Sequence, residues 1–264
     1  MSRIKKTFRK LRDKGQAALI PFIVAGDPSI EMTEALVHKM VENGGDIIEL
    51  GVPFSDPLAD GPTIQAGSQR ALGNGANLNN IFHLTKRLRA IDAPLVLMTY
   101  FNPVFQYGLK PFAAECRESA IDGVIIPDLP PEEAGPWIEE ARAFELDTIF
   151  LVAPTSPPER TKQINRWSRG FIYYVSVTGV TGARGKMPDE LESAVRRMKK
   201  QSKKPVAVGF GISTPEQARE VGRFADGVIV GSAIVKMIEE NLDSPELVAR
   251  VGRFVASLAE ALKS

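Results

Sequence analysis

Eight short apolar runs, separated by segments with helical periodicity, predict that this chain of 264 residues folds as a single (β/α)8 barrel. The runs are continuous rather than alternating, which is typical of parallel strands covered on both faces. Eight such units are the number that a barrel needs, whereas an open doubly wound sheet usually stops at about five or six strands. We therefore expect one domain over residues 1–264.

The predicted strands follow the apolar runs. Their starts are roughly 22 to 34 residues apart for most units, but the interval after the second strand is longer, so an insertion is expected there. A second long loop, Ser176–Pro188, follows the sixth strand and is rich in glycine. The eight strands are Ala18–Ala25, Asp46–Gly51, Leu95–Tyr100, Gly123–Pro127, Thr148–Ala153, Phe171–Val175, Pro205–Phe210 and Gly227–Gly231.

Helices are predicted where apolar residues recur at helical spacing. Ile4, Phe8 and Leu11 predict an extra helix at the N-terminus. Helix starts are marked by Asp27-Pro28-Ser29, Ser156-Pro157-Pro158 and Ser213-Thr214-Pro215, which place capping side chains and prolines in the first turn. The other helices are Glu31–Glu42, Leu78–Ile91, Pro111–Ala120, Glu132–Phe144, Glu159–Ser168, Asp189–Gln201 and Pro215–Arg223.

The composition is balanced and excludes several classes of protein. Thirty-three Lys and Arg against 32 Asp and Glu leave a net charge of +1, so no chain-wide field attracts nucleic acid or an anionic membrane. The longest uncharged stretch, residues 93–109, is shorter than the roughly 20 apolar residues that span a bilayer. The single cysteine, Cys116, excludes an intramolecular disulfide and a cysteine-based zinc cluster, which favours a cytoplasmic location.

Glu49 interrupts the apolar run at the carboxyl end of the second strand, where barrel enzymes build their active sites. A carboxylate there would be desolvated, which raises its pKa and suits it to general acid/base catalysis. The alternative is a buried ion pair.

Two further aspartates lie near strand ends. Asp60 belongs to the turn-rich loop that follows the second strand and is either a second catalytic group or a cap for a helix that begins near Pro62. Asp128 ends the fourth strand, where a turn or helix-capping role is equally expected.

Two glycine-containing segments after the seventh and eighth strands predict a phosphate site. Gly211 and Gly231 allow backbone N–H groups to approach an anion, and Ser232 adds a hydroxyl at the start of a short helix. Each segment alone is also explained by a tight turn or a helix C-cap.

The remaining side chains at the strand ends limit the chemistry further. No predicted strand ends in lysine, which counts against a Schiff-base aldolase. His38 and His83 fall inside predicted outer helices, so no metal site is implied. Four aromatic residues at strand ends either form a pocket for a flat ring or belong to the core: Phe22, Tyr100, Tyr173 and Phe210.

Four segments together resemble the tryptophan synthase alpha chain family over essentially the whole length. They are Phe22–Pro28, Glu49–Pro62, Gly179–Gly182 and Gly209–Ser213, of which Glu49–Pro62 is the most specific. The resemblance implies a lyase that cleaves indole-3-glycerol phosphate to indole and glyceraldehyde 3-phosphate in tryptophan biosynthesis. It also implies a partner, the beta chain, in a complex of two alpha and two beta subunits, with pyridoxal phosphate on the beta chain and no cofactor on this chain.

The resemblance implies a role for each matching site residue. Glu49 would shuttle the proton and Asp60 would polarise the indole N–H. Thr181 would close over the site and orient Asp60, while Tyr173 and Phe22 would line the indole pocket. The sequence departs from the family at Gly67 and Gly73–Gly75, which puts the rigidity of the helical insertion in doubt.

The loop after the second strand also contains a candidate contact with the partner. Pro53 and Asp56, with Phe54 and Pro57, are expected on an exposed rim that catalysis does not require to be apolar. A docking surface explains them, with an intersubunit ion pair at Asp56; the alternative is that the prolines only stiffen the loop.

Two other functions remain open at this point. One is a regulatory barrel that binds a phosphate ester without turnover, and the intact carboxylates argue against it. The other is a phosphosugar isomerase of histidine or tryptophan biosynthesis, which would share the phosphate site but lacks the Glu49–Pro62 segment.

Overall fold

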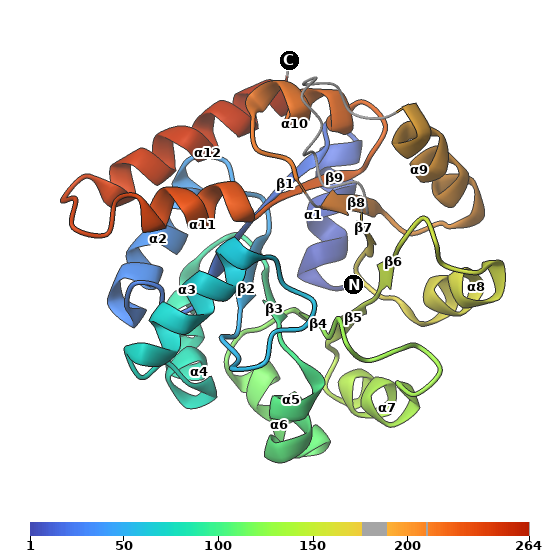
Figure 1. Cartoon of the computed structure of the whole chain (residues 1–264). Helices are drawn as coiled ribbons and strands as arrows, with labels where there is room; N and C mark the ends of the chain where they lie inside the picture. The colour runs from blue at the N-terminus through green and yellow to red at the C-terminus, as the bar shows by residue number, and fades with distance from the viewer. Residues whose placement is uncertain (176–188, 210, 264) are drawn as a thin grey trace.

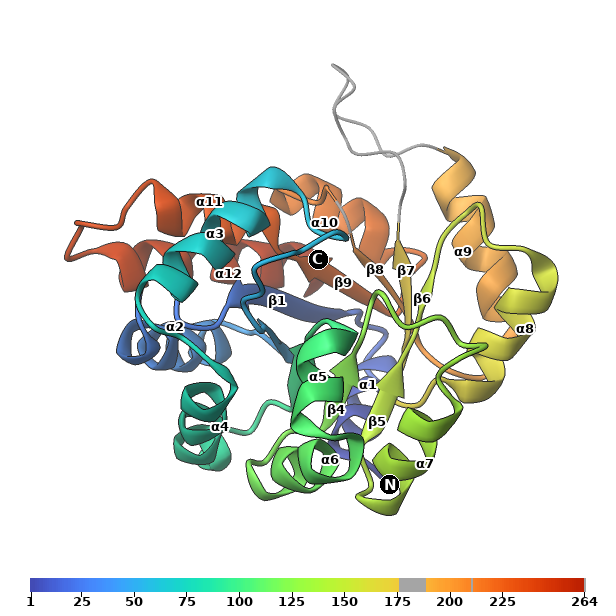
Figure 2. The ribbon, with the colours of Figure 1, turned by 60° about the horizontal axis from the view of Figure 1, so that its bottom comes forward.

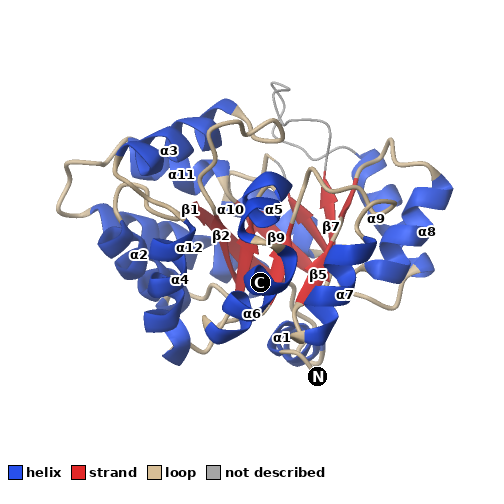
Figure 3. Cartoon of the chain, turned by 90° about the horizontal axis from the view of Figure 1, so that it is seen from below, coloured by secondary structure: helices blue, strands red, loops and turns tan. Residues whose placement is uncertain are grey.

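The computed structural model describes residues 1–175, 189–209 and 211–263, and these form the predicted barrel. Figure 3 shows the strands at the centre of the molecule with helices around them. All strand pairs are parallel, in the order β5-β4-β3-β2-β1-β9-β8-β7-β6. The strands are β1 Ala18–Val24, β2 Ile48–Gly51, β3 Leu95–Met98, β4 Gly123–Ile125, β5 Asp147–Ile149, β6 Leu151–Val152, β7 Ile172–Val175, β8 Val206–Gly209 and β9 Gly227–Val230.

Nine strands correspond to eight predicted ones because the fifth is divided at Phe150. Its first part, β5, pairs with β4, and its second part, β6, pairs with β7. The Phe150 carbonyl oxygen accepts a hydrogen bond of 3.1 Å from the Tyr173 N–H. One continuous segment therefore joins the two ends of the sheet and closes the barrel, which confirms the predicted fold class.

The helices surround the strands (Figure 1). Two predicted starts are confirmed by side-chain caps, since Ser29 accepts from the Met32 N–H and Thr214 from the Gln217 N–H. At the third, Pro157 precedes the helix without a side-chain cap. The helices are α1 Arg3–Arg12, α2 Ile30–Glu42, α3 Pro62–Gly73, α4 Leu78–Arg87, η1 Leu88–Ala90, α5 Phe101–Tyr107, α6 Leu109–Glu118, α7 Gly135–Ala143, α8 Pro158–Trp167, α9 Asp189–Gln201, α10 Pro215–Gly222, α11 Ser232–Glu239 and α12 Leu247–Lys263.

Helices α5 and α12 are absent from the sequence prediction, and α11 is predicted only as a short helix that starts at Ser232. Helix α5 has only seven residues, too few for a periodic signal, and the Asp128 carboxylate accepts from the Phe101 N–H at its first turn. Asp128 therefore does bind the start of a helix, but of one that precedes it in the chain and not of one that follows the fourth strand. Helices α11 and α12 follow β9; the buried residues Val251, Val255 and Leu258 of α12 do show helical spacing, so that signal is present in the sequence.

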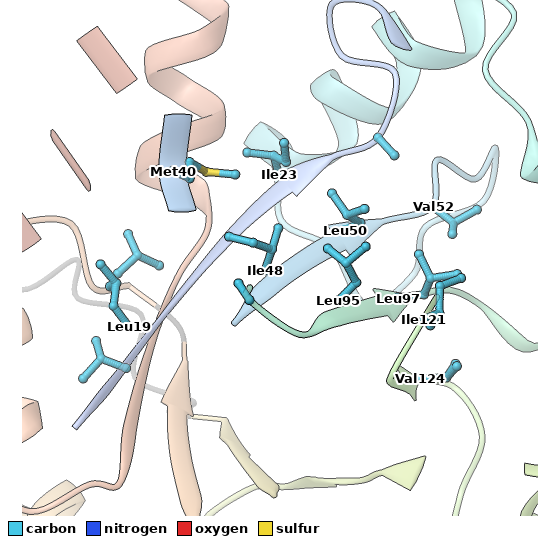
Figure 4. Close-up of a cluster of buried hydrophobic side chains, with 14 of the residues drawn as sticks. Leu19, Ile23, Met40, Ile48, Leu50, Val52, Leu95, Leu97, Ile121 and Val124 are labelled. Atoms are coloured by element: carbon cyan, nitrogen blue, oxygen red, sulfur yellow. The ribbon is translucent and has the colours of Figure 1, made fainter. Parts of the chain in front are cut away.

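Two apolar layers hold the barrel together. One fills its interior, where Ile4, Phe8 and Leu11 of α1 close the end at which the strands begin. The other lies between strands and outer helices, and Figure 4 shows part of it around Leu50 and Met40. Figure 2 shows α1 at the opposite end of the barrel from α3 and α11. The described helices include none long and apolar enough to cross a membrane.

Candidate active site

Glu49 lies on β2 and faces the barrel interior. Ile47, two residues earlier, belongs to the interior layer, and alternate residues of a strand share a face. The Glu49 side chain is 1% exposed, and neither carboxylate oxygen has a hydrogen-bond partner among the described residues. Burial raises its pKa to about 8, and the charge of Asp60 adds to the effect. Within the described part of the chain, Glu49 has no ion-pair partner that would explain it structurally.

Asp60 lies in the loop that joins β2 to α3, and its carboxylate is hydrogen-bonded to the Tyr100 hydroxyl. Burial raises the pKa of Asp60 to about 6, while the tyrosine hydrogen bond acts in the opposite direction. The cap of α3 is Gly61, which has no side chain to offer. The helix-cap alternative for Asp60 is therefore wrong.

Tyr100 holds the loop that carries Asp60. Its ring stacks on Phe54 with centroids 5.2 Å apart, and its hydroxyl oxygen accepts from the Ala59 N–H at 2.9 Å. Burial and the nearby charge of Asp60 raise the pKa of Tyr100. The sequence predicts Tyr100 as part of a ring pocket; the structure adds a contact with Asp60 that no sequence pattern indicates.

Phe22 and Tyr173 are two further aromatic residues near Glu49. Phe22 on β1 pairs in register with Glu49 on β2. Tyr173 on β7 is buried, and its pKa is raised by burial and by the charges of Glu49 and Asp60. The two aromatic residues that the sequence predicts for a ring pocket therefore lie near Glu49.

Glycines on neighbouring strands make room for these rings. A Cβ atom at Gly51 would lie 2.6 Å from Phe22 Cζ, and one at Gly209 would overlap the Tyr173 hydroxyl. A Cβ at Gly231 would lie 3.1 Å from Phe22 Cδ1. The sequence predicts Gly231 as a phosphate-binding, turn or helix-capping residue and does not reveal Gly51 as a packing position.

The predicted phosphate site lies at the start of α11. Gly231 is the N-cap of this helix, no side chain among the described residues caps it, and Ser232 is exposed in its first turn. Gly211 has φ of 78°, a conformation that favours glycine. A helix N-terminus left uncapped in this way offers N–H groups to an anion. Phe210 and Thr181 lie outside the described residues.

Comparisons with known proteins identify one family. The profile of the family described as Tryptophan synthase alpha chain matches residues 8–263. The tryptophan synthase alpha chain of Geobacter sulfurreducens is 50% identical, with 99% of this chain and 99% of that protein covered. The chain belongs to the tryptophan synthase alpha chain family.

Solved structures of tryptophan synthase alpha chains share the fold. The subunit alpha structure from Legionella pneumophila superposes with a TM-score of 0.93 at 40% identity and covers 99% of this chain and 98% of that one. A Mycobacterium tuberculosis tryptophan synthase structure gives a TM-score of 0.92 at 38% identity, with 100% and 99% covered. The resemblance seen in the sequence is confirmed.

One expectation about the loop that joins β2 to α3 is wrong for this alpha chain. Pro53 is buried rather than exposed, because the chain leaving β2 is still hydrogen-bonded to its neighbour through the Val52 N–H and the Met98 carbonyl. Further along the loop, Asp56 is exposed and Leu58 is 84% exposed. The exposed part of the rim therefore begins after Pro53.

Proposed function

We propose that Glu49 and Asp60 are the acid/base pair with which this chain cleaves indole-3-glycerol phosphate. The reaction is that of the family: the alpha chain of tryptophan synthase is a carbon–carbon lyase that releases indole and glyceraldehyde 3-phosphate in tryptophan biosynthesis. The observation that carries the assignment is a buried carboxylate, Glu49, beside a half-buried one, Asp60, with pKa values of about 8 and about 6. Two titratable groups whose surroundings push their pKa values apart are typical of an acid and a base that act together.

The two carboxylates suit the two halves of a retro-aldol cleavage. Protonated Glu49 donates its proton to indole C3, and ionised Asp60 stabilises the positive charge that then develops at the ring nitrogen. The Glu49 carboxylate next takes the proton of the glycerol hydroxyl beside C3. The O–H electrons form the aldehyde C=O, the bond to C3 breaks, and its electron pair restores the aromatic indole. The net change is one proton moved from oxygen to carbon.

The remaining predicted residues fit the two ends of this substrate. Phe22 and Tyr173 supply flat apolar surface for the indole ring. The start of α11, with Gly231 and Ser232, offers N–H groups and a hydroxyl for the phosphate, and Gly211 belongs to the same proposed site. Phe210 and Thr181 are proposed as further contacts on the sequence resemblance alone.

Release of indole from indole-3-glycerol phosphate tests this function, measured with the isolated chain and with a beta chain. We expect slow release alone, faster release with the partner, and inhibition by glycerol phosphate in both cases. A regulatory barrel would bind glycerol phosphate without producing indole. A phosphosugar isomerase would leave the indole compound intact and convert a phosphosugar instead.

The dependence of kcat/KM on pH provides a second test. Asp60 must be ionised and Glu49 protonated, so activity should rise as pH increases through about 6 and fall as it increases through about 8. The two limbs report the pair rather than single residues, because the groups interact. Initial rates from about pH 5 to 9.5 measure the profile. An activity that keeps rising above about pH 9 would contradict the role of Glu49 as the acid.

The alpha chain pairs with the beta chain of tryptophan synthase. We propose that the complex is cytoplasmic and that the beta chain carries the pyridoxal phosphate. The exposed rim offers a contact surface: Leu58 is 84% exposed and Phe105 of α5 is 62% exposed. Tyr100 connects the two segments that carry these residues. Its hydroxyl accepts a hydrogen bond from Ala59, next to Leu58, and Tyr100 itself directly precedes α5, which contains Phe105.

Replacement of Asp56 by alanine should weaken activation by the beta chain about two- to fivefold and leave cleavage by the isolated chain unchanged. Asp56 is exposed and has no ion-pair partner within the described residues, so it is available to a cation of the partner. We expect only a modest effect because exposed ion pairs contribute little binding free energy and are screened by salt.

The measurement is indole release against beta-chain concentration at low and high salt. Asp92→Ala is the matched control, because Asp92 is exposed and precedes β3 at the opposite end of the barrel. Full activation of the Asp56 variant at matched salt would show that the rim residues only stiffen the loop.

A further inference from the structure

A single guanidinium joins three separate segments next to the active site. Arg70, in the last turn of α3, donates from Nε and Nη2 to the two carboxylate oxygens of Asp27, each at 2.9 Å. Its Nη1 donates to Glu239 Oε1 at 2.8 Å. Asp27 belongs to the loop after β1, and Glu239 is the last residue of α11. Arg70 is thus the shared partner of the β1 loop, α3 and α11.

The contact between α3 and the β1 loop is tight. Asp27 is fully buried, and a Cβ atom at Gly67 would lie 2.9 Å from Asp27 Oδ2. Gly67 therefore lets the helix backbone approach the carboxylate. Asn74, directly after α3, donates to the Pro28 carbonyl at 2.7 Å. The end of α3 is held firmly, so the insertion is anchored despite its glycines.

Helices α3 and α11 lie side by side in both views of the ribbon (Figures 1 and 2). Asp60 lies two residues before the first residue of α3, and Ser232 is the first residue of α11. The two helices therefore start at the two ends of the proposed substrate, one at the carboxylate for the indole nitrogen and one at the phosphate. Their relative placement sets the distance between these groups.

The Arg70 contacts are well suited to fix that placement. A guanidinium has a planar fork that binds a carboxylate through two parallel hydrogen bonds, which restricts orientation as well as distance. The Arg70 side chain is 21% exposed, so water competes weakly for it. Because Asp27 is fully buried, loss of Arg70 would leave a buried carboxylate without its cation, and the loop and α3 would have to rearrange.

We propose that Arg70 is a positioning residue for the cleavage reaction, which holds Asp60 and the phosphate-binding start of α11 in register with the substrate. The inference rests on the proposed roles of Asp60 and α11. Arg70 acts through α3 and α11 and contacts no reacting atom. Its two contacts have separate roles, because the Asp27 pair orients α3 with Asp60 whereas the Glu239 pair ties α11 to α3.

Three variants test these separate roles through kcat and KM for indole-3-glycerol phosphate and the Kd of glycerol phosphate measured by calorimetry. Arg70→Met should lower kcat and raise KM, each about tenfold, since misplacement by about 1 Å has effects of this size or larger. Glu239→Gln should raise KM and the glycerol phosphate Kd about two- to threefold with kcat unchanged, because the Asp27 pair remains and Glu239 is 43% exposed. Arg70→Lys keeps the positive charge but loses the planar guanidinium, so its kcat and KM should lie between those of Arg70→Met and Glu239→Gln.

Arg87→Met is the matched control. It removes an arginine of α4 that binds Glu34 of α2 at 2.8 Å, an ion pair that lies away from α3 and α11 and is more exposed than that of Arg70 with Asp27. We expect kcat, KM and Kd of this variant to equal those of the parent. All variants are assayed at one temperature, about 15 °C below the lowest of their melting temperatures, so that loss of stability alone does not lower the rate.

Two results would overturn the proposal. One is unchanged kcat and KM in folded Arg70→Met or, if that variant does not fold, in Arg70→Lys. The other is an unchanged KM and Kd in Glu239→Gln. Failure of the proposed function looks different: the parent would release no indole. The calorimetric Kd of glycerol phosphate then still reports whether Arg70 and Glu239 shape the start of α11.

Discussion

Replacing Glu49 by glutamine is expected to lower kcat by about 10²- to 10⁴-fold, or roughly 3 to 5 kcal/mol in the barrier, while the substrate still binds. Glutamine keeps the shape of the side chain but donates no proton to indole C3 and accepts none from the glycerol hydroxyl. The alkaline limb of the pH profile near 8 should disappear with it. Single-turnover rates and the Kd of glycerol phosphate separate the chemical step from binding.

Stability distinguishes a catalytic role from damage to the fold. The folded protein holds the Glu49 proton up to about pH 8, whereas the unfolded chain loses it near the ordinary glutamate pKa of 4.5. Between these values the native state binds more protons, so this group makes the parent less stable as the pH rises. The Glu49→Gln variant lacks this dependence and should melt at the same or a higher temperature at about pH 8. Near-normal turnover would contradict the assignment.

Asp60→Asn is expected to lower kcat by about 10²- to 10³-fold, because an amide carries no negative charge to stabilise the protonated indole. The acid limb near pH 6 should be lost. The contact with the Tyr100 hydroxyl can persist with an amide oxygen, so the loop keeps its anchor and KM changes less than kcat. The measurement is the pH dependence of kcat/KM for this variant.

A matched variant separates the charge of Asp60 from the anchoring of its loop. Tyr100→Phe removes the hydroxyl that binds Ala59 and Asp60 but retains the ring that stacks on Phe54. Tyr100→Phe should change both KM and kcat and should keep the acid limb of the pH profile. That limb should move to a higher pH, because the hydrogen bond that lowers the Asp60 pKa is gone. An unaltered acid limb in Asp60→Asn would assign that limb to another group.

The strands and most helices could be predicted because their signals are local. A continuous apolar run reports a strand covered on both faces, and serine or threonine before a helix satisfies its first N–H groups. The position of Glu49 at a strand end followed from the same local pattern. Helix α5 was not predicted because it is short and because Asp128, which binds the Phe101 N–H at its start, lies 27 residues away in the chain.

The repeat of eight units, the strand that carries Glu49 and the loop that carries Asp60 follow from the amino-acid sequence alone. The folded structure was needed to show that Glu49 is buried without a partner among the described residues, and that Asp60 contacts Tyr100, a residue beyond the next strand. It also decided that Pro53 is buried and that Arg70 binds Glu239, 169 residues away. Periodicity and capping act over a few residues, whereas burial, pKa and ion pairing depend on which distant segments the closed barrel brings together.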